Sequence, residues 1–148
     1  DARWFTREEI GEALARDGAR LGLGAESVAK IEQVRAAGLK SLEILKTAGV
    51  RMAFGTDLLG ASHDLQSEEF LIRAQVQSNL EVLQSATLIG AELLNQVGVI
   101  GEIAAGARAD LLLVDGNPLT DLACLTGQGE RIPLVMQGGK LRVNELRA

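Results

Sequence analysis

The stretch V-R-M-A-F-G-T-D, residues 50–57, decides the fold that we expect for this chain of 148 residues. It follows a long segment in which apolar residues recur at helical spacing, namely Val28, Ile31, Val34, Leu42 and Leu45. Gly49 is placed to end this amphipathic helix as a C-terminal cap. Residues 50–54 form a short apolar run that closes at Gly55, which predicts a buried strand. A helix that leads directly into a buried strand is typical of α/β proteins with parallel sheets.

Helix start signals recur on both sides of this stretch. Thr6 and Glu9 have capping-box spacing, which predicts a helix over residues 7–17, and a loop follows at residues 21–27. The lone G-x-G in that loop is a poor phosphate-binding candidate, because it lacks a third glycine and a preceding strand. A loop is expected over residues 58–66, and Ser67 is the expected N-cap of the next helix, with Glu68 and Glu69 in its first turn. A second helix is expected to begin at the capping box of Ser78 and Glu81. A third is expected to begin at Thr87 and to run to Asn95.

The pattern changes beyond Gly98, where short apolar runs alternate with glycines and turn residues. The run R-I-P-L-V-M-Q-G-G-K-L-R-V predicts a hairpin with Gly138 and Gly139 as its two-residue turn. We therefore expect two parts: residues 1–97, built of helices and one strand, and residues 98–148, rich in β-structure.

The composition excludes several classes of function. A net charge of −5 argues against nucleic acid or an anionic membrane surface as the main partner, and the few aromatic residues (one Trp, three Phe) argue against single-strand binding. Cys124 is the single cysteine, so there is no disulfide framework and a cytoplasmic location is expected. No apolar run approaches the roughly 18 residues of a membrane span. The chain starts at Asp1 without a Met, which we interpret as an excised or processed boundary.

Asp57 is the first candidate for chemistry. In parallel α/β proteins the functional residues lie at the carboxyl ends of strands, and the G-T-D sequence would place Asp57 there, with Gly55 and Thr56 positioning the turn. The alternative is that Asp57 caps a turn or the next helix through its side-chain oxygen. The bare tripeptide favours this turn interpretation, because Gly, Thr and Asp are all common turn residues.

The other candidates are weaker. His63 is the single histidine, and both His63 and Gln66 could contact a substrate if their loop borders an active site. The acidic residues near them, Asp64, Glu68 and Glu69, are most simply solvated or capping residues. Asp110 and Asp115 flank the run L-L-L-V as markers of strand ends, and Cys124 fits a small buried hydrophobe. A catalytic zinc needs about three protein ligands, and these residues do not supply them.

The order of motifs resembles the carboxyl-terminal portion of the metal-dependent amidohydrolase superfamily. The motifs are A-F-G-T-D, then S-A-T about thirty residues later, then G-E-I-A-A-G-A-R-A-D-L-L-L-V-D-G-N-P-L and I-P-L-V-M-Q-G-G-K. The run G-x-I-x-x-G-x-x-A-D-L is the most specific of them. The G-T-D-L-L-G…H…Q-S-E-E-F run and the ending are most similar to the imidazolonepropionase-like and Xaa-Pro dipeptidase (prolidase-like) branch.

The resemblance implies a (β/α)8 barrel with a small β-sandwich, and one or two divalent metal ions, commonly zinc, in the barrel mouth. Residues 50–54 would be the eighth strand, the helix before them the seventh helix, and residues 67–95 would contain the eighth helix. Residues from about 98 onward would form the carboxyl-terminal half of the sandwich. Asp57 matches the metal-binding Asp of the eighth strand, and it would also act as general base and acid.

The family's other metal ligands, an H-x-H pair, a lysine and two later histidines, have no counterpart here. A barrel of this kind needs about 250 residues, so we interpret the chain as a fragment whose partner is the missing amino-terminal part of the same enzyme. The intact enzyme would cleave amide bonds, with dipeptides such as Xaa-Pro as substrates. Two alternatives stay open: a cyclic-amide hydrolase or deaminase of the same fold, and a non-catalytic assembly or binding module. Homo-oligomerisation is left open as well.

The fragment interpretation makes a prediction about stability. The isolated 148-residue polypeptide would leave strand edges unpaired and the sandwich half built. We therefore expect it not to be a stable monomer, and a cooperative two-state melting curve for the isolated polypeptide would contradict this.

Overall fold

The computed structural model describes residues 37–58 and 60–146, and the chain divides into two compact units, Asp1–Ser41 and Leu42–Ala148. The helix expected over residues 7–17 and the loop at residues 21–27 lie outside the described residues. The boundary expected near residue 97 stays a prediction. Across the described residues, none of the helices combines the length and apolar character needed to cross a membrane.

The amphipathic helix before the key stretch ends as predicted. Residues 37–47 are helical, and Gly49 takes a φ of +70°. The Val50 N–H donates to the Leu45 carbonyl at 3.0 Å and the Gly49 N–H to the Lys46 carbonyl at 3.0 Å. These two bonds form a Schellman motif, which satisfies carbonyl groups of the last helical turn. A glycine at this position is favoured because a side chain disfavours the left-handed region.

The buried strand predicted for residues 50–54 is not formed among the described residues. The segment is irregular, and Val50 at its start is 47% exposed. A strand requires a neighbour to complete its main-chain hydrogen bonds, and the three-stranded sheet of the described residues does not include this segment. Helices bind it instead: the Phe54 N–H donates to the Ser85 carbonyl at 3.0 Å, and the Arg73 guanidinium donates to the Ala53 carbonyl at 2.9 Å.

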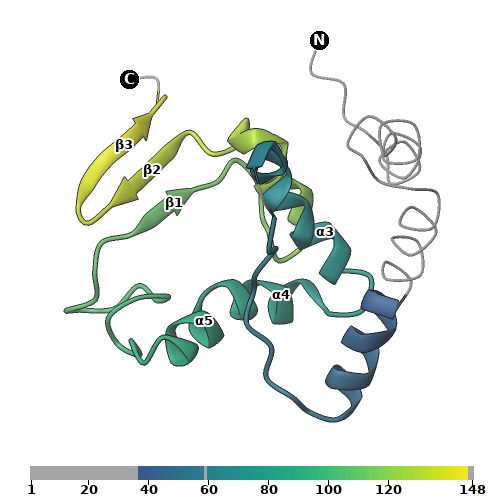
Figure 1. Cartoon of the computed structure of the whole chain (residues 1–148). Helices are drawn as coiled ribbons and strands as arrows, with labels where there is room; N and C mark the ends of the chain where they lie inside the picture. Colours follow the sequence, from purple (N-terminus) through teal and green to yellow (C-terminus); the bar gives the residue numbers. More distant parts are fainter. Residues whose placement is uncertain (1–36, 59, 147–148) are drawn as a thin grey trace. The chain divides into compact units, whose positions relative to one another are not determined.

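Four helical elements follow this segment (Figure 1). They are the 3-10 helix η1 (Gly60–Glu68), α3 (Glu69–Arg73), α4 (Asn79–Ala86) and α5 (Leu88–Leu93). The loop predicted over residues 58–66 is thus largely helical, and the N-cap predicted at Ser67 is wrong. The chain is already in helical conformation when it reaches Ser67, and Glu68 precedes α3 without a capping side-chain bond. The start at Thr87 is confirmed, since Thr87 is the N-cap of α5.

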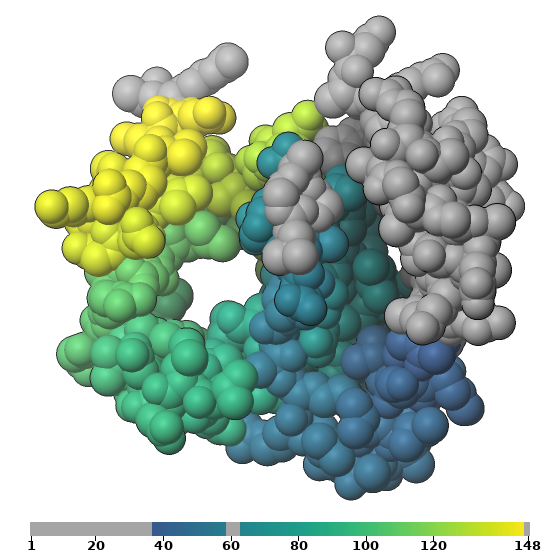
Figure 2. Space-filling view, viewed as in Figure 1, coloured from purple at the N-terminus to yellow at the C-terminus, as the bar shows by residue number. Residues whose placement is uncertain are grey.

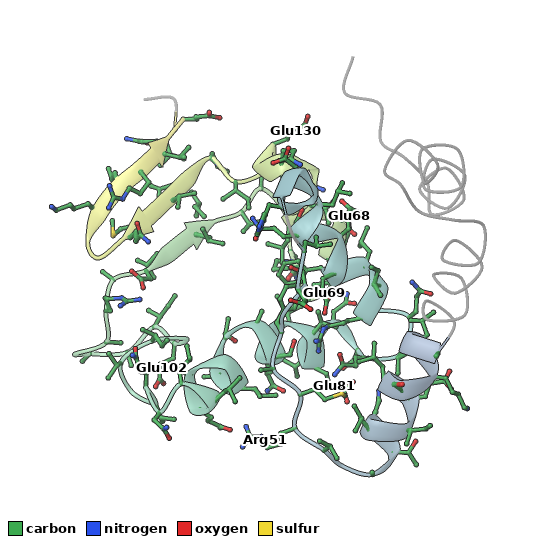
Figure 3. All side chains as sticks on the ribbon, in the orientation of Figure 1. Arg51, Glu68, Glu69, Glu81, Glu102 and Glu130 are labelled. Atoms are coloured by element: carbon green, nitrogen blue, oxygen red, sulfur yellow. The ribbon has the colours of Figure 1, made fainter. Side chains whose placement is uncertain are left out.

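The capping box at Ser78 is confirmed. The Glu81 N–H donates to Ser78 Oγ at 3.3 Å, while the Ser78 N–H donates to Glu81 Oε2 at 2.7 Å. Lys46 Nζ donates to the same Glu81 oxygen at 2.9 Å and to the Val76 carbonyl at 2.9 Å. Glu81, labelled in Figure 3, therefore joins the start of α4 to the end of the helix over residues 37–47. The pKa of Glu81 is lowered from 4.5 to about 2. The hydrogen bond from the Ser78 amide has the largest effect, and the hydrogen bond from Lys46 has the second largest.

The β-rich tail forms one antiparallel sheet in the order β1-β2-β3, with β1 (Leu111–Leu113), β2 (Leu134–Gln137) and β3 (Lys140–Asn144). The predicted hairpin turn is confirmed: Gly138 and Gly139 have φ values of +56° and +75° between β2 and β3. Positive φ at both central residues matches the type I′ turn that the strand twist favours. Two short 3-10 helices, η2 (Leu122–Leu125) and η3 (Gly127–Gly129), precede β2.

The core lies where η2 meets the helices. Its buried members are Val82, Leu122, Cys124 and Leu125, and the partly buried Phe54, Phe70, Leu83 and Val114 pack against them. Cys124 is 0% exposed, which confirms the prediction of a small buried hydrophobe. Figure 2 shows an opening bordered by the green residues that lead into β1. Large apolar side chains stay exposed outside the core, such as Ile103 at 90% and Leu93 at 71%.

The capping box predicts the effect of removing its hydroxyl. Ser78→Ala should lower the free energy of unfolding of the full-length protein by about 1 kcal/mol, because a helix N–H loses its acceptor. Chemical denaturation measures the loss. Ser41→Ala is the matched control, since the Ser41 hydroxyl bonds back to the Ala37 carbonyl within a helix and alanine is the better helix former. An equal loss in both variants would contradict the capping role.

The lowered pKa of Glu81 predicts a pH dependence. A carboxyl whose folded pKa lies below its unfolded value stabilises the protein above the unfolded pKa, and that contribution disappears as the pH falls through the folded pKa. The stabilisation by Glu81 should therefore be complete above pH 4.5 and fade as the pH falls toward 2. Denaturation midpoints of wild type and Glu81→Gln should differ at neutral pH and converge in this window. A difference that is independent of pH would show that the charge is not involved.

Candidate functional site

The chain turns at Asp57 through a left-handed backbone conformation. Asp57 has a φ of +52°, one of the few left-handed non-glycine residues in the described part, and its side chain is exposed. Gly55 does not take a positive φ, and a Cβ built on it meets nothing within 4 Å. The backbone strain thus lies at the carboxylate-bearing residue and not at the glycine. Asp adopts this region more readily than most residues, and such conformations cluster at functional sites.

A cavity of about 370 Å³ lies directly before this turn. It is lined by Phe54, Gly55, Thr56, Gln66, Ser67 and Phe70. The structure therefore brings Gln66 of η1 to the same cavity as the Gly55-Thr56 turn. Aromatic walls with a few polar groups are typical of small-molecule sites.

Two predicted site residues are not among those that line the cavity. Asp57 follows Thr56 at the cavity wall, with its carboxylate exposed to solvent. His63 lies in η1 and is also exposed. Neither the metal-ligand role of Asp57 nor the substrate contacts of His63 and Gln66 is decided by this placement. They stay predictions, as do the turn-positioning roles of Gly55 and Thr56.

The donor set for a metal ion is incomplete in the described part of the chain. The described residues contain no cluster of three or more His, Cys, Asp or Glu side chains able to hold a metal ion. The exposed Asp57 carboxylate fits a divalent cation as one oxygen ligand. The remaining ligands would have to come from residues other than those described.

A buried arginine supports the segment before Asp57. Arg73 on α3 is 6% exposed, and its Nε donates to Glu69 at 2.7 Å while its Nη2 donates to the Ala53 carbonyl at 2.9 Å. Its guanidinium carbon lies 5.4 Å from the centre of the Phe54 ring, which in turn lies 4.5 Å from the Phe70 ring. The sequence interpretation missed Arg73. The signal that could have found it is the Glu69–Arg73 spacing of four residues, which places both on one helix face.

The most specific sequence run, residues 101–111, has structural roles. Gly101 has a φ of +81°, and a Cβ there would lie 2.6 Å from the Thr87 carbonyl, so this close approach to the α4–α5 junction requires glycine. Asp110 Oδ1 accepts the Gly138 N–H at 2.7 Å, which joins the start of β1 to the hairpin turn. The hydrogen bond from the Gly138 amide, and to a smaller extent the hydrogen bond from Arg108, lowers the pKa of Asp110. Asp110 and Asp115 flank β1, which confirms them as markers of strand ends.

Comparison with known proteins places these features in a family. Residues 4–141 match the family described as "Amidohydrolase family". A solved amidohydrolase is 56% identical with a TM-score of 0.84, over 93% of this chain and 33% of that one. A prolidase solved in complex with N-methylphosphonate-L-proline is 50% identical with a TM-score of 0.81, over 90% of this chain and 33% of that one.

A more distant relative is ochratoxinase of Aspergillus niger. It is 29% identical over 137 residues, which are 92% of this chain and 28% of ochratoxinase. The chain therefore spans about a third or less of the length of the relatives that it matches.

Proposed function

The chain belongs to the amidohydrolase family, and on that premise we propose that it is part of a metal-dependent hydrolase that cleaves the amide bond of dipeptides such as Xaa-Pro. The likeness to a prolidase solved with a proline phosphonate supports the dipeptide substrate. The observation that carries the proposal is the strained, exposed Asp57 beside a cavity with aromatic walls.

In this proposal, further chain from the amino-terminal side completes a (β/α)8 barrel around the described residues. Residues 50–54 take the position of the eighth strand, the helix over residues 37–47 that of the seventh helix, and β1–β3 that of half a sandwich. Two observations support this arrangement. The segment 50–54 is apolar yet unpaired within the described sheet, and large apolar side chains such as Ile103 and Leu93 are exposed.

Asp57 has two roles in the proposed mechanism. Its carboxylate contributes one ligand to a divalent cation, for which zinc is the family's common choice, and the other ligands come from the additional chain. When bound, such a cation would supply Lewis-acid chemistry that activates water and polarises the scissile carbonyl. The Asp57 carboxylate then accepts the proton that the attacking water loses, and it returns this proton to the leaving amine. One carboxylate serves both steps because they occur in sequence.

The cavity accounts for substrate binding in the same scheme. The Phe54 and Phe70 rings form an apolar wall that suits a proline ring or another apolar side chain. The Gln66 amide offers both a donor and an acceptor to the substrate's main-chain groups. His63 on the exposed side of η1 would contact only a group that projects out of the cavity.

The role of Asp57 is tested by Asp57→Asn in the full-length enzyme. Asn tolerates the left-handed conformation as well as Asp does, so the variant removes the charge without adding backbone strain. We expect the turnover of Xaa-Pro dipeptides to fall by about 10² to 10⁴-fold, while the melting temperature is retained. Steady-state kinetics and elemental analysis for bound metal provide the measurements.

Asp64→Asn is the matched control, because Asp64 is an exposed acidic residue of η1 close to Asp57 in sequence. It should leave turnover unchanged. A loss of less than about tenfold in Asp57→Asn, equivalent to about 1.4 kcal/mol, would exclude the general-base role. An absence of both bound metal and dipeptide turnover in the wild-type full-length protein would favour the non-catalytic assembly or binding module.

A further inference from the structure

We propose that Arg73 is a positioning residue for the candidate site: it holds residues 53–54 in place and thereby sets the position of the Asp57 carboxylate. This inference rests on the proposed function for its catalytic meaning. The physical part, that Arg73 holds the turn, depends only on contacts among the described residues.

The contacts of Arg73 converge on the segment that carries Asp57. Its Nη2 donates to the Ala53 carbonyl at 2.9 Å, four residues before Asp57 along the chain. Its guanidinium also lies over the Phe54 ring, 5.4 Å from the centroid, at the wall of the cavity. One side chain from α3 therefore binds both the main chain and the side chain of the segment directly before the turn.

Glu69 fixes the guanidinium in this orientation. Its carboxylate accepts from Arg73 Nε at 2.7 Å, and the two side chains are 18% and 8% exposed. Glu69, labelled in Figure 3, is the first residue of α3, so the pair spans the whole of this short helix. With Nε held by Glu69, the planar guanidinium aims Nη2 at the Ala53 carbonyl.

Stability alone does not require a charge at this position. Burying an ion pair costs desolvation energy, and well-packed apolar residues in its place are often as stable or more stable. What an arginine adds over an apolar residue is direction, because its donors fix the partner groups in one geometry. Within the described residues this segment pairs with no strand. In the proposed barrel its strand neighbours come from the additional chain, and Arg73 adds a separate contact from α3 at Ala53.

Nη1 of the same guanidinium is buried and has no hydrogen-bond partner among the described residues. A buried donor of this kind is normally satisfied. It is therefore available to a carbonyl or carboxylate oxygen of the additional chain, beside the Glu69 and Ala53 bonds. The bond to Ala53 does not depend on that third partner.

The test uses Arg73→Met in the full-length enzyme, since Met retains apolar bulk without donors. The amides of residues 54–58 should exchange hydrogen at least about tenfold faster than in wild type, while those of α4 keep their protection. The kcat should fall by about a hundredfold with a much smaller change in KM, because misplacing the carboxylate affects the transition state more than substrate binding. Bound metal per protein should fall after dialysis against a weak chelator.

Arg51→Met is the matched control. Arg51 pairs with Glu92 at 2.6 Å on the surface, with a side chain 63% exposed, and it does not line the cavity beside Asp57. It should leave the kcat and the exchange of residues 54–58 unchanged. If Arg73→Met does not fold, Arg73→Lys tests the same claim with the charge retained. Lysine should not restore the kcat, because an ammonium lacks the planar fork that reaches Glu69 and Ala53 together.

A folded Arg73 variant with wild-type exchange at residues 54–58 would overturn the proposal, and so would faster exchange combined with an unchanged kcat. Failure of the proposed function has a different signature. In that case Asp57→Asn retains activity, whereas the exchange measurement still decides whether Arg73 holds the turn.

Discussion

The bond from the Arg73 guanidinium to the Ala53 carbonyl is the interaction on which the candidate site depends. Residues 50–57 end at Asp57, the candidate for chemistry, yet the sheet of the described residues gives this segment no neighbouring strand. Two helices supply hydrogen bonds to this segment in place of strand pairing. The α3 helix binds the Ala53 carbonyl through Arg73, and α4 binds the Phe54 amide through the Ser85 carbonyl. The turn at Asp57 is therefore held by a few directed bonds and one aromatic contact, and not by regular secondary structure.

The same segment is connected to the rest of the described chain through the core. Phe54 and Phe70 pack against Val82 of α4 and against η2, so the cavity wall and the hydrophobic core share side chains. The run over residues 101–111 serves a different purpose. Its Gly101 permits a close approach to Thr87, and its Asp110 binds the hairpin turn at Gly138. The most specific part of the family pattern thus supports the fold, and the candidate for chemistry lies in the less specific G-T-D.

Local signals predicted the described elements well where a few neighbouring residues decide the outcome. The Schellman motif at Gly49, the capping box at Ser78 and the turn at Gly138 and Gly139 all form as predicted, because their hydrogen bonds close within six residues. The strand predicted over residues 50–54 is not formed among the described residues, and the N-cap predicted at Ser67 is wrong. The first needs a partner distant in sequence, and the second competes with a 3-10 helix that already includes it.

Sequence patterns alone predicted the family, the helix end at Gly49, the helix starts at Ser78 and Thr87, the hairpin, and the choice of Asp57 as the candidate for chemistry. These depend on motif order, on turn residues and on backbone preferences, all of which are local. Only the tertiary structure decided that the left-handed strain lies at Asp57 and not at Gly55, that Gln66 reaches the cavity, and that Arg73 holds the segment. The physical reason is that each of these depends on contacts between residues far apart in sequence. Such contacts are set by packing, which no periodicity or spacing encodes.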